Sequence, residues 1–179
     1  RSLLVVGTGA IGQEVAKRAR ALGLRTIGLN RTVAPLPDFD SIRPMAELHA
    51  CLAEADIVSL HLPLSPATRH VIDAAALAAM PAGAMLVNTG RGELVDTAAL
   101  VDALAQRRLA GAYLDVFEAE PLPAESPLWQ LDNVILSPHC ADLVADWELV
   151  LADYFLDNLE RRLGGRRGAG LREREEQGA

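Results

Sequence analysis

The stretch that decides the fold is LLVVGTGAIG at residues 3–12. Its first four residues are apolar, as in a buried strand, and residues 13–22 after it have the pattern of a helix. Gly7 permits a tight turn, Gly9 lets main-chain amides approach a pyrophosphate, and Gly12 lets helix and strand pack closely. The stretch predicts a dinucleotide site whose phosphates lie at the positive end of the helix. Taken alone, the motif also fits a Gly-rich strand exit in any parallel α/β protein.

Length and composition limit the class of protein. The 179 residues suit one domain with a real core, and half of them are apolar, which excludes a disordered chain. The net charge of −7 disfavours a nucleic-acid partner. Cys51 and Cys140 are far apart in the sequence, which favours a reducing compartment, so we expect a cytoplasmic protein. Neither cysteine lies in a metal-binding motif, so we expect no metal site. No apolar run reaches membrane-spanning length, and we expect no membrane partner.

Expected strands and helices alternate along the rest of the chain. The expected strands cover residues 25–30, 56–62, 84–88, 110–116 and 134–137. The expected helices cover residues 45–55, 74–80, 97–108 and 142–163. Asp73 and Asp96 would be N-caps, and residues 35–44 would form a connector. The alternation predicts an α/β fold with a doubly wound parallel sheet of Rossmann type, whose ligand lies at the carboxyl ends of the strands.

The expected domain organisation is a dinucleotide-binding domain at residues 1–163 followed by a disordered polar tail at residues 164–179. The domain would end in a long amphipathic helix. Its apolar stripe suits packing or subunit contact, and consists of Trp147, Leu151, Phe155 and Leu159.

The end of the second expected strand carries Asn30, Arg31 and Thr32, where a dinucleotide fold usually has an acidic residue for the adenosine ribose hydroxyls. A carboxylate would repel a 2′-phosphate, whereas Arg31 can pair with it and its two neighbours can hydrogen-bond it. The sequence therefore predicts that NADP(H) is preferred over NAD(H). An ordinary polar loop with an exposed Arg31 is the alternative.

Three residues at the expected ligand edge suit hydride transfer to a 2-keto acid. That reaction needs a proton donor for the oxygen, a cation for the carboxylate, and a nicotinamide held against the carbon. His139 suits the donor, Glu120 would raise the pKa of the imidazole, and Arg91 would bind the carboxylate in a fork geometry. The alternative is a surface Arg, a solvated Glu and a capping His.

Four motifs in this order resemble the signature of the D-isomer-specific 2-hydroxyacid dehydrogenases. They are the glycine turn at 7–12, VNTGRG at 87–92, LDVFEAEP at 114–121 and SPH at 137–139. The resemblance covers residues 3–163, and it implies that Arg91 binds the substrate, Glu120 assists the His, and His139 is the acid/base.

The resemblance also implies nucleotide contacts and a homodimer formed through this domain. Asp115 would hold the nicotinamide carboxamide, and other contacts map to Ala10, Ile11, Thr89 and Gly90. Pro63 joins this set because it follows a strand at the same edge of the sheet.

The chain departs from the usual pattern of that family. Family members carry a substrate lobe of about a hundred residues before the glycine turn, and this chain, which begins with Arg1, has none. Asp142 stands where the family has a small residue, and residues 164–179 replace a stretch that returns to the substrate lobe. We expect the nucleotide lobe of a glyoxylate- or hydroxypyruvate-reductase-like enzyme, with its activity alone in question. The alternatives are a 3-phosphoglycerate-type dehydrogenase and a non-catalytic dinucleotide-sensing module.

Overall fold

The computed structural model describes residues 1–143 and 145–164. These residues fall into two compact units, Arg1–Ala141 and a second unit that begins at Asp142. Among the described residues, no helix combines the length and apolar character needed to cross a membrane.

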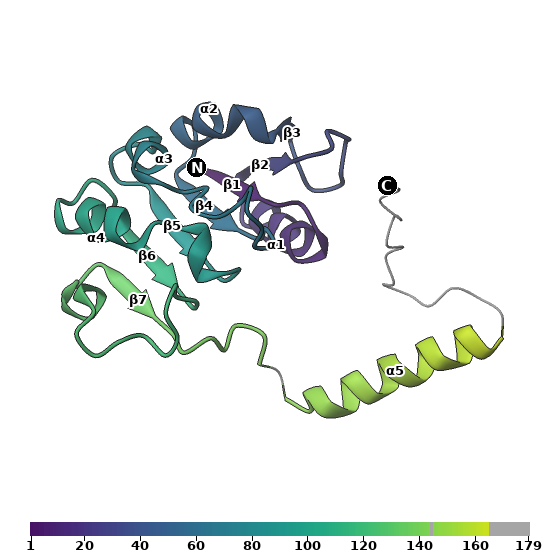
Figure 1. Ribbon diagram of the computed structural model, residues 1–179. Helices are drawn as coiled ribbons and strands as arrows, with labels where there is room; N and C mark the ends of the chain where they lie inside the picture. The colour runs from purple at the N-terminus through teal and green to yellow at the C-terminus, as the bar shows by residue number, and fades with distance from the viewer. Residues whose placement is uncertain (144, 165–179) are drawn as a thin grey trace, which may run out of the picture. The chain divides into compact units, whose positions relative to one another are not determined.

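The first unit is built on a parallel sheet (Figure 1). Its strands are β1 (Ser2–Val6), β2 (Arg25–Asn30), β3 (Ser41–Pro44), β4 (Ile57–Leu60), β5 (Met85–Asn88), β6 (Gly111–Leu114) and β7 (Val134–Leu136). All neighbouring strands pair in parallel, in the spatial order β3-β2-β1-β4-β5-β6-β7. The order reverses between β1 and β4, and ligands of doubly wound sheets bind outside the carboxyl ends of the strands at such a reversal. The predicted fold is confirmed.

Helices cover both faces of this sheet. They are α1 (Ala10–Ala21), α2 (Leu48–Ala53), α3 (Ala74–Ala79) and α4 (Thr97–Ala105), with short 3-10 turns η1 (Met45–Glu47), η2 (Gly92–Leu94) and η3 (Pro127–Gln130). The predicted caps are confirmed, because the carboxylates of Asp73 and Asp96 accept hydrogen bonds from the amides of Ala76 at 2.8 Å and Ala99 at 3.0 Å.

Alternation along β1 produces a separate core on each face of the sheet. Leu4 and Val6 point to the face where the buried residues of α2, α3 and α4 gather. Leu3 and Val5 point to the opposite face and pack with Ala16 of α1. Successive side chains of a strand point to opposite faces, so a strand covered on both faces is apolar throughout.

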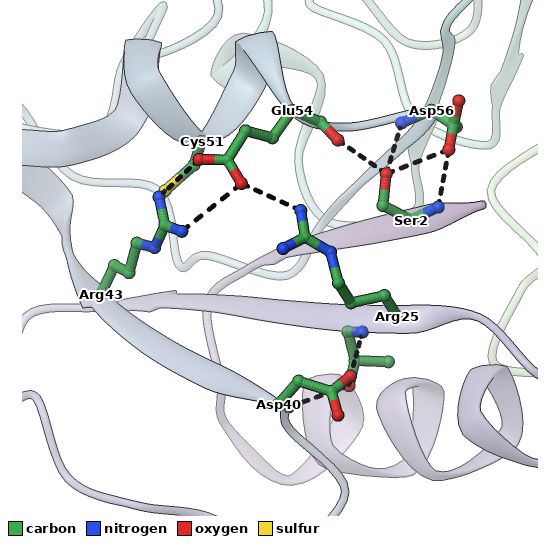
Figure 2. A network of polar contacts seen from close by, with 8 residues as sticks. Ser2, Arg25, Asp40, Arg43, Cys51, Glu54 and Asp56 are labelled. Atoms are coloured by element: carbon green, nitrogen blue, oxygen red, sulfur yellow. Dashed lines mark hydrogen bonds and ion pairs between the residues drawn. The ribbon is translucent and has the colours of Figure 1, made fainter.

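The connector expected at residues 35–44 was wrong in part, because its last four residues form β3. Figure 2 shows what stabilises this edge strand: the Glu54 carboxylate accepts hydrogen bonds from Arg43 of β3 at 2.8 Å and from Arg25 of β2 at 2.9 Å. The carboxylate of Asp40, just before β3, accepts from the Thr26 amide at 2.8 Å. These contacts join residues far apart in sequence, and the polar, Pro-bounded segment has no strand pattern of its own.

The second unit contains α5 (Trp147–Leu163), described here by itself. The helix expected from residue 142 begins at Trp147, because Asp146 has a left-handed backbone with φ of 58°. The predicted apolar stripe lies on α5. Apart from Gly164, the predicted polar tail lies outside the described residues, so the domain boundary at residue 163 stays a prediction.

Candidate active site

The glycine turn between β1 and α1 has the geometry that its sequence predicts. Gly7 has a φ of 101°, and a Cβ added there would lie 2.7 Å from the carbonyl oxygen of His61. A Cβ at Gly12 would overlap the carbonyl oxygen of Gly7. A Cβ at Gly9, by contrast, would meet nothing within 4 Å. The fold itself therefore requires Gly7 and Gly12, whereas Gly9 leaves open space at the start of α1.

Two further features of the turn fit a phosphate-bearing ligand. Gly9 is the N-cap of α1 and offers no side-chain cap, so the amides of the first turn stay available to an anion. Thr8 is only 4% exposed, yet its hydroxyl has no hydrogen-bond partner among the described residues. A polar group bound at the turn would supply that missing bond. Ala10 and Ile11 are exposed beside it, as expected for nucleotide contacts.

The end of β2 presents the polar residues that were predicted to select the cofactor. The Asn30 side chain accepts a hydrogen bond from the Arg31 amide at 2.8 Å, which orders the turn. Arg31 and Thr32 are exposed, and the Arg31 guanidinium forms no ion pair within the described residues. A cation without a protein partner can pair with a phosphate.

The turn after β5 carries Arg91. The Asn88 side chain shapes this turn by donating to the Arg91 carbonyl at 2.9 Å and accepting from the Gly90 amide at 3.1 Å. The Arg91 side chain is exposed, with one guanidinium nitrogen 2.7 Å from the Gly90 carbonyl. Thr89 and Gly90 are half-buried in the same turn, and Pro63 is exposed just after β4, the neighbouring strand.

His139 and Glu120 form a hydrogen-bonded pair, with 2.8 Å between Nδ1 of His139 and Oε2 of Glu120. Glu120 also accepts from the Phe117 amide at 3.0 Å. The hydrogen bond from His139 lowers the pKa of Glu120, and the same bond raises the pKa of His139. An ionised carboxylate can only accept, so Nδ1 carries its proton toward Glu120 and Nε2 is left to exchange a proton with a ligand.

Asp115 holds the loop that carries His139. The residue is 1% exposed, and its carboxylate accepts from the Ser137 hydroxyl and from the amides of Cys140 and Ala141, both at 2.9 Å. Burial raises the pKa of Asp115, but these hydrogen bonds outweigh it and the pKa is lowered. Since Ser137 donates to Asp115, the Tyr113 hydroxyl 2.8 Å away donates to Ser137. The predicted contact between Asp115 and a nicotinamide stays a prediction.

An apolar cavity of about 270 Å³ adjoins the His139–Glu120 pair. Its apolar walls are Phe117, Pro121, Leu122, Trp129, Leu136 and Pro138. The pair itself is exposed, with 47% of the His139 side chain and 36% of the Glu120 side chain accessible, so a ligand can reach both residues from the cavity.

Sequence reasoning missed several residues of this site. Ser137 lies inside the quoted SPH motif, but nothing local indicates that its hydroxyl bridges Tyr113 and Asp115. The unpaired hydroxyl of Thr8 had no signal beyond its place in the glycine turn. His61 has a structural contact, because its Nε2 lies 2.8 Å from the Ser59 hydroxyl, and burial lowers its pKa.

Comparison with known proteins agrees with this geometry. Residues 1–141 match the family model for the D-isomer specific 2-hydroxyacid dehydrogenase, NAD binding domain. An (S)-sulfolactate dehydrogenase from Chromohalobacter salexigens is 41% identical over 167 residues, which are 92% of this chain and 54% of that protein. A glyoxylate reductase from Aeropyrum pernix is 42% identical over 159 residues, which are 89% of this chain and 48% of that protein.

A solved D-isomer specific 2-hydroxyacid dehydrogenase from Xanthobacter autotrophicus Py2, in complex with NADPH and MES, superposes with a TM-score of 0.87 at 36% identity. The match covers 96% of this chain and 70% of that one. The chain spans about half the length of the curated relatives it matches. The match to the family model and the parallel sheet agree: the chain is an NAD-binding domain of the D-isomer specific 2-hydroxyacid dehydrogenase family.

Proposed function

We propose that the protein is an oxidoreductase that interconverts a small 2-keto acid and the matching 2-hydroxy acid. The observation that carries the proposal is the His139–Glu120 pair, which leaves a protonatable Nε2 beside an exposed Arg91 turn on the ligand edge of the sheet. His139 donates a proton to the keto oxygen, and Glu120 stabilises the imidazolium. Arg91 binds the substrate carboxylate through two parallel hydrogen bonds.

The nicotinamide cofactor supplies the hydride when it is bound. The residues that would hold it are the glycine turn with Ala10 and Ile11, the exposed residues Asn30, Arg31 and Thr32, and the strand exits at Pro63, Thr89, Gly90 and Asp115. Open space at Gly9, uncapped amides and the unpaired Thr8 hydroxyl support this placement.

NADPH is the preferred cofactor in this proposal. The support is an exposed Arg31 without an ion-pair partner in the described part of the chain, at a position where an acidic side chain would repel a 2′-phosphate. The Xanthobacter relative in complex with NADPH agrees with this preference.

The substrate class is a small 2-keto or 2-hydroxy acid, with glyoxylate and hydroxypyruvate as the first candidates. The glyoxylate reductase relative supports this choice, and the sulfolactate dehydrogenase relative widens it to other 2-hydroxy acids. Homodimer formation through this domain and a cytoplasmic location stay predictions from the sequence.

The test combines binding with turnover. Calorimetry on residues 1–179 should show NADPH binding more tightly than NADH. Oxidation of NADPH in the presence of glyoxylate or hydroxypyruvate should fall about 100-fold or more in His139→Ala, the usual worth of a general acid. Equal rates for His139→Ala and wild type would remove His139 from the reaction. In a protein that also carries a substrate lobe, tight nucleotide binding without any turnover would instead favour a dinucleotide-sensing module.

A further inference from the structure

A second His–Glu pair has its glutamate in the same loop as Glu120. Glu118 and Glu120 are two positions apart, and Nε2 of His70 lies 2.5 Å from Oε1 of Glu118. We infer that His70 and Glu118 are positioning residues, which hold the loop at residues 115–121 so that Glu120 meets His139. This inference rests on the proposed function, in which the His139–Glu120 pair supplies the proton.

Main-chain hydrogen bonds connect the segment that carries His70 to the turn that follows Arg91. The His70 amide donates to the Glu93 carbonyl at 2.8 Å, and the Ile72 amide donates to the Leu94 carbonyl at 3.0 Å. Ile72 also forms a parallel bridge with Val95. His70 is therefore anchored to this turn by the main-chain bonds of its own amide and of Ile72, two residues further on.

Glu118 contacts the start of α4 and the same turn. Its second carboxylate oxygen accepts from the Thr97 amide at 3.3 Å, at the start of α4. A Cβ at Gly92 would run into the main chain of Phe117 and Glu118, so the two turns touch directly. The side chain of Glu118 is 29% exposed and that of His70 is 37% exposed, which shields the pair in part from water.

Phe117 connects this loop to the His139–Glu120 pair. Its main chain packs on Gly92, and its amide donates to Glu120 at 3.0 Å. Burial raises the pKa of Glu118, but hydrogen bonds from Thr97 and His70 outweigh it, so the carboxylate is ionised and can accept from both. If Glu118 loses its partners, the loop at Phe117 is held less firmly, and Glu120 is less well placed against His139.

A direct charge effect predicts a different result from a positioning effect. The charged groups that act on His139 are Glu120, Asp115 and Arg91. Replacing His70 leaves the Glu118 carboxylate in place, so simple electrostatics predicts no fall in the His139 pKa. Positioning predicts that it falls, because a Glu120 that is less well placed stabilises the imidazolium less.

The experiment is an NMR titration of His139 in residues 1–179, with Glu118→Ala, Glu118→Gln, His70→Asn and the double variant. Asn is used because His70 has a φ of 49°, which Asn tolerates. We expect Glu118→Ala and His70→Asn each to lower the His139 pKa. In the double variant the His139 pKa should be no lower than in the more affected single variant. Glu118→Gln keeps an acceptor for the Thr97 amide, so it should lower the His139 pKa less than Glu118→Ala does. Asp132→Ala, which breaks the exposed pair with Arg107, should leave the pKa unchanged.

An unchanged His139 pKa in Glu118→Ala or in His70→Asn overturns the inference, as does a fall of equal size in Asp132→Ala. If Glu118→Ala does not fold, His70→Asn and Glu118→Gln decide the question. The titration needs neither substrate nor cofactor. A lowered pKa together with full activity of His139→Ala would therefore retain the positioning role and refute the proposed function.

Discussion

Nδ1 of His139 lies 2.8 Å from a carboxylate oxygen of Glu120, and the two residues come from different strand exits. This contact decides which nitrogen of His139 is available for chemistry, because a carboxylate accepts but does not donate. The remaining nitrogen, Nε2, can then give a proton to a keto oxygen or take one from a hydroxyl.

Glu120→Gln should lower the pKa of His139. The hydrogen bond and the negative charge of Glu120 both favour the imidazolium, and the amide supplies no charge. NMR titration of the His139 ring protons measures the change. Glu54→Gln is the control, because Glu54 binds Arg25 and Arg43 on other strands. An equal pKa in wild type and Glu120→Gln would show that the contact does not form in solution.

The proposed reduction should lose rate as the pH rises through the His139 pKa. The donor must be protonated, and Glu120 extends the protonated state to higher pH than an ordinary His allows. Glu120→Gln should therefore shift the fall in kcat/KM to lower pH, with the oxidation reaction showing the opposite slope. A rate profile of the variant that overlays that of the wild type would contradict the role of Glu120.

Two glycine variants should separate folding from nucleotide binding. Gly12→Ala places a methyl group against the Gly7 carbonyl and should destabilise the fold by about 1–3 kcal/mol or more. Gly9→Ala meets nothing within 4 Å, and its φ of −70° suits Ala, so the free energy of unfolding should change by less than about 0.5 kcal/mol.

Calorimetry should nevertheless show weaker NADPH binding by Gly9→Ala, because the methyl group occupies the space in which the phosphates approach the amides. Urea unfolding of both variants supplies the stability comparison. Unchanged NADPH affinity in a folded Gly9→Ala would place the pyrophosphate elsewhere.

Arg31→Asp should reverse the cofactor preference. Loss of a charged hydrogen-bond partner costs about 1.5–3 kcal/mol, so NADPH affinity should fall about 10- to 100-fold while NADH affinity holds or improves. Arg108→Asp, an exposed residue after α4, is the matched charge control. If the ratio of the two affinities is the same in Arg31→Asp as in wild type, Arg31 does not contact the phosphate.

Asp115→Asn should destabilise the fold by about 1–3 kcal/mol, because a buried amide cannot accept all the hydrogen bonds that Ser137, Cys140 and Ala141 donate. The folded-state pKa of Asp115 is lowered, so its contribution is present above the ordinary Asp pKa of about 3.9 and is lost as the pH falls through the folded-state value. The difference in unfolding free energy between wild type and Asp115→Asn should therefore shrink on acidification. Urea unfolding across that pH range measures it, and a constant difference would contradict the assignment.

The sequence by itself determined the parallel sheet, because the strand, turn and helix signals that alternate along residues 3–137 each depend on contacts within a few residues. It also identified Asp73 and Asp96 as caps, since a cap bonds an amide three residues away. Arg91, Glu120 and His139 became candidates through their residue types at the expected ligand edge and through the order of the motifs, and their roles stay predictions.

Only the tertiary structure decided which distant residues meet. β3 pairs with β2, Glu54 binds Arg43 of β3, and Thr26 binds Asp40 just before it; no local pattern records such contacts. The same holds for Asp115, which is bound to the His139 loop, and for Glu118, whose partner His70 lies 48 positions earlier in the chain. A hydrogen bond between two loops depends on where the sheet places their ends, and that placement is a property of the whole fold.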